Sequence, residues 1–257
     1  MKTILSLTGL SKSFGGIHAV QNCNFSIDQG TITGLIGPNG AGKTTVFNLL
    51  TGLLHADSGT LEFCGENMTT WPAYKRAQAG FARTFQMIRI FPNLTVLENL
   101  KVALKDNKQD FRHIFVNQKK LQKRLDTEAK ELLKRVNLEG HAQLLAGELS
   151  YGQQKLLEIL RTVAMNPKVI LLDEPAAGIN RTLLQTIIQL IYELQKEGKT
   201  LIVIEHDMGF IMEVCEKIIV MDFGKEIAEG TPEEIQKNPK VLEAYLGSEP
   251  ILATSHA

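Results

Sequence analysis

The sequence predicts an α/β fold with a glycine-rich loop after a buried strand and a helical segment inserted later in the chain. The glycine-rich run GPNGAGKTT at residues 37–45 lies between an apolar, β-branched stretch at Thr31–Ile36 and a stretch with helical spacing at Thr44–Leu54. A continuous apolar run at residues 168–172 ends in two carboxylates, which is typical of a parallel strand covered on both faces. From about Met87 to Leu160 strand-like runs stop and helical patterns take over.

The glycine-rich run matches the pattern G-x-x-x-x-G-K-[ST] in the strand–loop–helix context that phosphate binding needs. Its residues are Gly37, Pro38, Asn39, Gly40, Ala41, Gly42, Lys43, Thr44 and Thr45. The glycines let backbone N–H groups converge on an anion in front of the positive end of the next helix. Lys43 is expected to reach the β- and γ-phosphates and the Thr44 hydroxyl to bind Mg²⁺. The context favours this interpretation over a glycine-rich turn before an ordinary helix.

Upstream of this loop, residues 3–9 and Asn24–Ile27 predict two short strands, and residues 12–22 predict a turn-rich connection between them. Phe14 in this connection is a candidate for stacking on an adenine base. Packing of the same ring against the core is nearly as good an explanation, and the sequence favours stacking only slightly.

After the loop, Thr60–Cys64 predicts a strand and Thr70 is a candidate N-cap for a short helix that ends near Gly80. Phe81–Gln86 predicts a further strand with Gln86 at its end. By itself, a glutamine at a strand end is weak evidence for a functional role.

The helical segment contains an amphipathic pattern with apolar residues at Leu121, Leu125, Ala129, Leu132, Leu133 and Val136. Between Lys101 and Arg135 there are eleven Lys and Arg residues against five Asp and Glu. Because the acids are interspersed, a solvated helical face explains this stretch better than a nucleic-acid surface does.

Ser150 precedes a second amphipathic helical pattern, and Gln153 three residues later gives the spacing of a capping box. A capped helix is a sufficient explanation of this pair. The alternative is functional: Ser150 and Gly152 offer a hydroxyl and a backbone N–H to a phosphate at a helix N-terminus.

The second buried strand, at residues 168–172, leads into the adjacent carboxylates Asp173 and Glu174. At this end of a parallel strand Asp173 is expected to hold Mg²⁺, and Glu174 is expected to be the general base for an attacking water. His206 follows a third predicted strand, Thr200–Ile204, and its ring N–H is placed to bond the γ-phosphate or that water.

The remaining elements follow in simple order. They are a helix at Arg181–Lys196, a helix at Met208–Cys215, strands at Lys217–Met221 and Lys225–Ala228, two short helices after Thr231 and Pro239, and a frayed tail at Ser248–Ala257.

The composition of the chain narrows the classes of function that it can have. With 28 basic and 28 acidic residues the formal net charge is zero, so no overall field attracts nucleic acid or acidic lipid. Three widely separated cysteines allow no disulfide framework, which favours a reducing cytosol. No signal peptide is apparent and no apolar run approaches the roughly 20 residues that span a bilayer. Any membrane role is therefore expected to act through partners.

Taken together, six motifs resemble those of the ATP-binding cassette (ABC) ATPases, in the same order. They are GPNGAGKTT, Gln86, LSYGQQ, VILLDEP, AAGIN and His206, which resemble the Walker A motif, Q-loop, signature, Walker B motif, D-loop and switch histidine. The resemblance implies a single domain over residues 1–247. Its fold is a P-loop α/β core with an antiparallel β subdomain and an inserted α-helical subdomain at about 87–160.

The resemblance also implies that ATP and Mg²⁺ are the cofactors. Glu174, His206 and Gln86 would act in hydrolysis, and Gln86 would join Thr44 and Asp173 as a metal ligand. In this family two cassettes pair head to tail, so Ser150, Gly152 and Gln153 would complete the site of a second ATPase subunit.

Further partners implied are two integral membrane permease subunits, contacted from the cytoplasmic face of the membrane, and indirectly a solute-binding protein. Nucleic acid is not expected.

Within the family, GFARTFQMIRIFPNLTVLENL, LSYGQQKLLEILR and PAAGIN resemble branched-chain amino acid importer ATPases. Tyr151 stands where the signature usually has glycine, Asn180 where the D-loop usually has aspartate, and Phe14 where many cassettes have tyrosine. The ATPase of a lipopolysaccharide exporter and a soluble cassette protein of DNA repair or translation are the alternatives. A P-loop kinase or GTPase is disfavoured by the paired acids, the signature and the absence of a guanine-binding motif.

Overall fold

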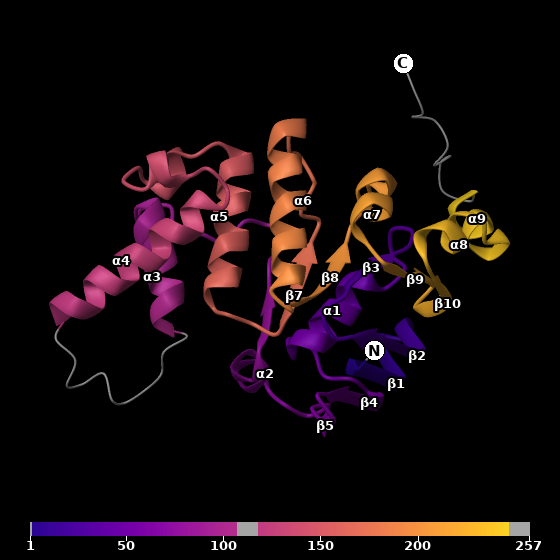
Figure 1. Ribbon diagram of the computed structural model, residues 1–257. Coiled ribbons are helices and arrows are strands. Elements are labelled where there is room, and N and C mark those ends of the chain that lie inside the picture. Colours follow the sequence, from indigo (N-terminus) through magenta and orange to yellow (C-terminus); the bar gives the residue numbers. More distant parts are fainter. Residues whose placement is uncertain (1, 107–117, 247–257) are drawn as a thin grey trace, which may run out of the picture.

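The computed structural model describes residues 2–106 and 118–246, which form two β-sheets and a set of surrounding helices (Figure 1). The strands are β1 Thr3–Phe14, β2 Ile17–Asp28, β3 Ile32–Ile36, β4 Ser58–Phe63, β5 Glu66–Asn67, β6 Phe81–Arg83, β7 Val169–Asp173, β8 Thr200–Ile204, β9 Lys217–Asp222 and β10 Lys225–Gly230. The α-helices are α1 Lys43–Thr51, α2 Ala73–Ala79, α3 Val96–Asp106, α4 Gln118–Lys134, α5 Tyr151–Ala164, α6 Arg181–Lys196, α7 Met208–Val214, α8 Pro232–Gln236 and α9 Pro239–Leu246.

The larger sheet has six strands in the order β10-β9-β3-β8-β7-β6 and is parallel except for the β9–β10 pair. Every residue of β3, β7 and β8 is buried, which explains why these segments are continuous apolar runs. The predicted α/β core is confirmed, and the carboxyl ends of its central strands lie along one edge.

Side chains on the two faces of this sheet enter different cores. On one face Ile170, Leu172 and Val203 pack with the helices α3 to α7. On the other face Leu171 and Ile204 pack with α1 and the smaller sheet. Helix α1, which begins directly after the glycine-rich loop, is therefore enclosed in the second of these cores, with Val46 and Phe47 fully buried.

The smaller sheet is antiparallel, with the order β2-β1-β4-β5, and it corrects the prediction for the N-terminal segment. Residues 12–22 were predicted to be a turn-rich connection, but they complete a hairpin of two twelve-residue strands. Only Gly15 and Gly16, both with positive φ, form the turn. The polar residues that suggested a loop, Lys12, Ser13, Gln21 and Asn22, are partly or fully exposed within these strands.

The helical part lies to one side of the large sheet and consists of α3, α4, two short 3₁₀ turns at Glu139–His141 and Ala146–Glu148, and α5 (Figure 1). The amphipathic interpretation of α4 is confirmed, because Leu125, Ala129 and Leu133 are buried against this part of the core. Part of the basic stretch between Lys101 and Arg135 lies outside the described residues. The boundary of a helical subdomain at 87–160 stays a prediction.

Two predicted helix starts have different outcomes. The Ser150 hydroxyl accepts the N–H of Gln153, and the Gln153 side chain accepts the Ser150 N–H at 3.0 Å, so the capping box is confirmed. Thr70 is not an N-cap. Helix α2 begins at Ala73, and its N-cap is Pro72, whose side chain has no polar atom to bond the helix. Because the proline ring fixes φ, Pro72 holds φ −68° at the N-cap without a side-chain hydrogen bond.

The remaining predicted elements agree with the structure to within one or two residues, with two exceptions. Helix α1 ends at Thr51, three residues before the predicted Leu54, and β6 ends at Arg83 and leaves Gln86 in the loop beyond it. The predicted frayed tail at Ser248–Ala257 lies outside the described residues. None of the described helices is long and apolar enough to cross a membrane.

Gly59 at the start of β4 provides a test of the antiparallel sheet. Its φ is +88° and a Cβ would lie 2.4 Å from the Gly9 carbonyl group of β1, whereas Gly65, with φ +83°, has open space around it. Gly65→Ala should cost about 1–2 kcal/mol of stability for the left-handed backbone alone. Gly59→Ala should cost clearly more because two backbones must separate. Urea unfolding of both variants measures this, and equal losses would contradict the close approach.

Candidate functional site

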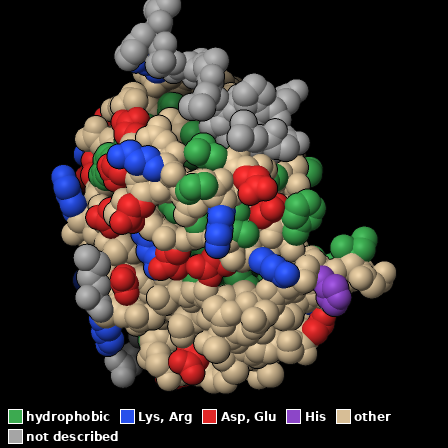
Figure 2. All heavy atoms as spheres, turned by 90° about the vertical axis from the view of Figure 1, so that its right-hand side faces the viewer, with side chains coloured by type: hydrophobic (Ala, Val, Ile, Leu, Met, Phe, Trp, Pro, Cys, Tyr) green, Lys and Arg blue, Asp and Glu red, His purple; other side chains and the backbone are tan. Residues whose placement is uncertain are grey.

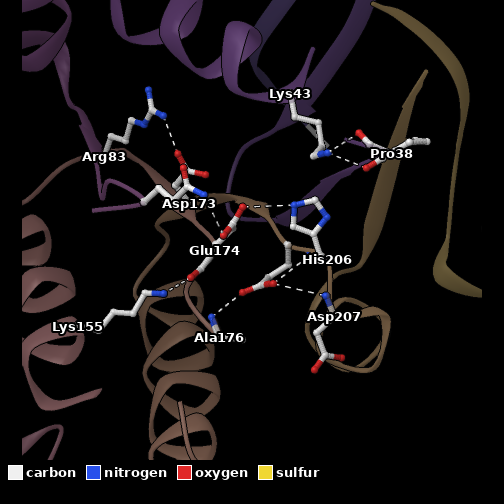
Figure 3. A network of polar contacts seen from close by, with 12 residues as sticks. Pro38, Lys43, Arg83, Lys155, Asp173, Glu174, Ala176, His206 and Asp207 are labelled. Atoms are coloured by element: carbon white, nitrogen blue, oxygen red, sulfur yellow. Dashed lines mark hydrogen bonds and ion pairs between the residues drawn. The ribbon is translucent and has the colours of Figure 1, made fainter. Parts of the chain in front are cut away.

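Four of the predicted functional residues, Lys43, Asp173, Glu174 and His206, come together at the carboxyl-end edge of the parallel strands (Figure 3). The glycine-rich loop follows β3, Asp173 ends β7 and is followed by Glu174, and His206 lies just beyond β8. Because these strands are neighbours in the order β3-β8-β7, their ends converge on one location. Chain segments far apart in the sequence therefore form one site.

The glycine-rich loop is held against the backbone of two neighbouring strands. A Cβ on Gly37 would lie 2.1 Å from the Met221 carbonyl oxygen, and one on Gly42 would lie 2.3 Å from that of Ala19. Both glycines have φ values, +149° and +101°, that side-chain-bearing residues rarely adopt. The loop therefore requires glycine at these positions for steric reasons as well as for anion approach.

The start of helix α1 presents backbone N–H groups that no side chain caps. Its N-cap, Gly42, makes no side-chain cap, and its first turn contains no acidic residue. The first N–H groups of a helix have no partner within the helix, and they carry the positive end of its dipole. With Asn39 and Gly40 exposed and Thr44 exposed at the helix start, this end is accessible to an anion.

Lys43 places a buried ammonium group inside the loop. Its Nζ donates to the carbonyl oxygens of Gly37 at 2.6 Å and Pro38 at 2.9 Å, and the residue is only 6% exposed. Burial lowers the pKa of Lys43, and the nearby carboxylates of Glu174 and Asp173 oppose this effect. The arrangement supplies a positive charge where phosphate oxygens would meet the loop.

Glu174 is in contact with both other predicted catalytic residues. Its Oε1 lies 3.3 Å from His206 Nε2, and Gln86 Nε2 donates to its Oε2 at 3.5 Å. The backbone of Glu174 has φ +49°, an unfavourable conformation for this residue type. Strained positions of this kind gather at functional sites because the surrounding fold holds them in place.

The donor set fits a magnesium ion bound together with a nucleotide. Thr44 and Asp173 offer a hydroxyl and a carboxylate oxygen, and Gln86 offers an amide oxygen. Magnesium typically takes few protein ligands and completes its shell with water and phosphate. Among the described residues no cluster of three or more His, Cys, Asp or Glu side chains is arranged to hold a metal by itself.

Three buried charged residues that sequence reasoning missed hold these loops. Glu205 accepts the N–H groups of Ala176 at 2.6 Å and His206 at 2.9 Å. Lys155 of α5 donates to the carbonyl oxygens of Glu174 and, at 3.2 Å, Ala177. Arg83 of β6 forms an ion pair with Asp173. The sequence feature that could have identified these residues is a charged side chain at an otherwise apolar position of a strand or helix.

The signature residues are not brought to this loop. Ser150 is exposed, its hydroxyl is used in the capping box, and none of the described hydrogen bonds or ion pairs joins it to residues 37–45. A Cβ on Gly152 would lie 2.5 Å from Leu183, so this glycine allows α5 to approach α6 closely. Phe14 is 45% exposed at the hairpin end, with Lys12 Nζ 5.6 Å from its ring. Stacking of Phe14 on a base stays a prediction.

A cavity of about 660 Å³ lies beside the loop, lined by Pro38–Ala41, by Phe223 and Ile227, and by Lys240 and Glu243 of α9. None of the predicted catalytic residues lines it. The face that includes α8, α9 and β10 mixes acidic, basic and apolar side chains without a predominance of one charge (Figure 2).

Comparison with protein families gives two matches. The ABC transporter family matches residues 20–177, and a family described as branched-chain amino acid ATP-binding cassette transporter matches residues 225–250. The chain is 40% identical to the high-affinity branched-chain amino acid transport ATP-binding protein BraF of Pseudomonas aeruginosa, over 96% of this chain and 98% of that protein. It is 35% identical to the lipopolysaccharide export system ATP-binding protein LptB of Haemophilus influenzae, over 96% and 98%.

Solved structures agree with these matches. The ADP conformation of MJ1267, an ATP-binding cassette of an ABC transporter, has a TM-score of 0.83 at 32% identity and covers 96% of this chain and 100% of its own. The dimeric post-hydrolysis state of the ATP-binding cassette MJ0796, bound to ADP and Pi, has a TM-score of 0.78 at 26% identity over 89% and 99%. The predicted fold class, an ABC ATPase core with an antiparallel β-sheet, is confirmed.

Glu158 of α5 provides a pH test of the site's framework. Its Oε1 accepts the N–H groups of Phe85 at 3.4 Å and Arg89 at 3.1 Å, on either side of Gln86, while its buried Oε2 has no partner among the described residues. Burial raises the pKa of Glu158. The folded protein therefore keeps this proton to a higher pH than the unfolded chain, and stability is lost as pH rises through the folded pKa.

Glu158→Gln keeps an acceptor and cannot ionise. At about pH 8 it should be more stable than the wild type, by about 1.4 kcal/mol for each unit of the pKa rise, and the gain should vanish near pH 4. Glu98→Gln is the matched control. Hydrogen bonds from Thr95 lower the pKa of Glu98, so this substitution should reduce stability at pH 8. Urea unfolding at both pH values decides, and a pH-independent effect of Glu158→Gln would contradict the buried charge.

Proposed function

The chain belongs to the ABC transporter family of ATP-binding proteins, and we propose that it drives import of branched-chain or other hydrophobic amino acids by hydrolysing ATP. The family and fold make the chain an ATPase. The observation that supports the site assignment best is the contact of Glu174 with both His206 and Gln86, at the same edge of the sheet as Lys43.

The glycine-rich loop and the residues that flank it would bind the nucleotide. The N–H groups of residues 37–45 and the Lys43 ammonium would hold the phosphates, and Lys43 would exchange its bonds to Gly37 and Pro38 for phosphate oxygens. Phe14 would stack on the adenine. Thr44, Asp173 and Gln86 would hold Mg²⁺, which neutralises phosphate charge when bound.

Hydrolysis needs a base for the attacking water, and Glu174 is placed for that role. One of its carboxylate oxygens would accept a proton from the water as the water oxygen bonds to the γ-phosphorus and the bond from that phosphorus to the bridging oxygen of the departing ADP breaks. His206, within 3.3 Å of Oε1, would hold the γ-phosphate or the water through its ring N–H. Gln86, which donates to the other carboxylate oxygen of Glu174, would help to orient the same water.

A single chain lacks one side of this site. Asn39, Gly40 and Thr44 are exposed at the start of α1, while Ser150, Gly152 and Gln153 form a second helix start that does not reach them. We propose that two cassettes pair head to tail, so that each signature completes the partner's site. The solved dimer of a related cassette, bound to ADP and Pi, supports the pairing of two cassettes.

Import of hydrophobic amino acids is the preferred transport role. The relatives named for branched-chain amino acid transport and the family match at residues 225–250 support it. Two permease subunits on the membrane, contacted from the cytoplasm, and a solute-binding protein would complete the system. Residues 87–160, within a single domain at 1–247, would transmit motion to them. Similarity to an exporter ATPase keeps lipopolysaccharide export as the alternative. No role in nucleic-acid binding is proposed.

Glu174→Gln tests the catalytic assignment. It should keep ATP binding and abolish steady-state hydrolysis, because an amide cannot accept the water proton. Phosphate release and equilibrium nucleotide binding measure the two effects separately. Undiminished hydrolysis would remove Glu174 from the role of base.

The same substitution in cells tests the substrate class. A strain whose only copy carries Glu174→Gln should lose uptake of labelled leucine while keeping its lipopolysaccharide export. The opposite pattern would favour the exporter.

Two inactive variants test the shared site by complementation. Lys43→Ala removes the phosphate contact, and Ser150→Arg blocks the signature with a bulky charge, so each homodimer should be inactive. A mixture of the two forms heterodimers in which an intact loop faces an intact signature. Hydrolysis should therefore reappear on mixing, and no recovery from a mixture that does form heterodimers would contradict the composite site.

A further inference from the structure

Arg83, the last residue of β6, lies beneath the candidate metal ligands and is almost completely buried. Its Nη2 is 2.6 Å from Asp173 Oδ2, and the two side chains are only 6% and 5% exposed. Its Nη1 donates to Asn48 Oδ1 of α1, also at 2.6 Å. One guanidinium group thus bridges the end of β7 and the helix that follows the phosphate loop. Figure 3 shows the Arg83–Asp173 half of this bridge.

The bridge joins the same two elements that would share a metal ion. Asn48 lies four residues after Thr44 in α1, so the two residues share one face of the helix. Asp173 is the other end of the bridge and the other expected oxygen ligand. Arg83 therefore fixes the helix face bearing Thr44 relative to the Asp173 carboxylate.

The surroundings leave the guanidinium little freedom. Its Cζ lies 5.4 Å from the centre of the Phe47 ring and 5.2 Å from that of Phe85. The neighbouring residue Thr84 accepts the Asp173 N–H at 3.0 Å, so the backbone and the side chain of Asp173 are both held by β6 and its extension. The ion pair uses Oδ2 and leaves the other carboxylate oxygen unused by Arg83.

Stability alone is a poor explanation for this arrangement. A buried ion pair often contributes no more than apolar residues of the same volume, because both charges lose their hydration. In addition, Arg83 Nε is buried without a partner among the described residues, which is unfavourable. An arginine that bonds two elements at an energetic cost indicates a requirement for defined geometry.

We propose that Arg83 is a positioning residue that holds the Asp173 carboxylate in register with Thr44, so that a divalent cation binds together with the nucleotide. This inference rests on the proposed function. Residues that orient a metal ligand from behind commonly change metal affinity by about 10- to 100-fold when they are replaced. The phosphate contacts of residues 37–45 do not involve Arg83, so nucleotide binding without metal should not depend on it.

The test measures binding rather than turnover. Manganese(II) takes the same kind of oxygen ligands as magnesium and is detected by electron paramagnetic resonance. Its affinity is measured in the presence of a non-hydrolysable ATP analogue, and binding of a fluorescent ATP analogue is measured separately in EDTA. In R83Q the manganese affinity should fall about 10- to 100-fold, while nucleotide binding in EDTA stays at the wild-type value.

Two further variants grade the effect. R83K keeps the charge but cannot bond Asn48 and Asp173 together as a planar fork does, so its loss should be intermediate. N48A removes one arm of the bridge and leaves the ion pair, so its loss should be smaller still. If R83Q does not fold, R83K and N48A provide the test. A manganese affinity equal to that of the wild type in both variants would then overturn the proposal.

The control is R135Q, which removes another arginine with two acidic partners, Glu193 at 3.2 Å and Glu197 at 2.9 Å, away from the site. It should leave manganese and nucleotide binding unchanged. Unchanged manganese affinity in R83Q, or an equal loss of nucleotide binding in EDTA, would overturn the positioning role. Absence of analogue-dependent manganese binding in the wild type would instead contradict the metal site of the proposed function.

Discussion

Buried charged side chains bonded to loop backbone or to a carboxylate are the interaction on which the geometry of the site depends. Loops at strand ends have no ladder partners, so their polar groups must be satisfied by something else. Lys155 binds the carbonyl groups of Glu174 and Ala177, and Glu205 binds the amides of Ala176 and His206. Charge-assisted bonds in a low-dielectric setting are strong and directional. They can therefore keep Glu174 in its unfavourable backbone conformation.

In the phosphate loop, too, a buried charge is held by backbone groups. Lys43 is satisfied by two carbonyl oxygens of its own loop, so its ammonium is already desolvated and oriented. Phosphate oxygens would replace these carbonyls rather than a full hydration shell, which reduces the cost of ordering the side chain. The close backbone contacts at Gly37 and Gly42 restrict the loop in the same way. The backbone of this loop is therefore fixed by packing within the protein, and under the proposed function a phosphate would meet a loop that is already ordered.

The sequence could predict those parts of the molecule that depend on local pattern. Continuous apolar runs marked β3, β7 and β8, and the order of the motifs placed Lys43, Asp173 and His206 at one edge. The strands at residues 3–9 and 24–27 were predicted, but their continuation through residues 12–22 was missed. Each of these strands is defined by pairing with the other, and only Gly15 and Gly16 mark the turn. Arg83, Lys155 and Glu205 were missed because a charged residue in an apolar run has no meaning until its partner in space is known.

Helix α5 explains why the signature and the catalytic loops belong to one mechanism under the proposed function. Along its fourteen residues, Ser150 caps its start, Lys155 holds the loop after Glu174, and Glu158 binds amides on both sides of Gln86. A helix with this many internal bonds moves as a rigid unit. A partner cassette that engages Ser150 would therefore act on the Glu174 loop and the Gln86 loop at once, without a separate relay between them. Arg83 ties the first residues of the Gln86 loop back to Asp173 and α1. Displacement of α5 would consequently strain this loop between a moving end at Glu158 and a fixed end at Arg83.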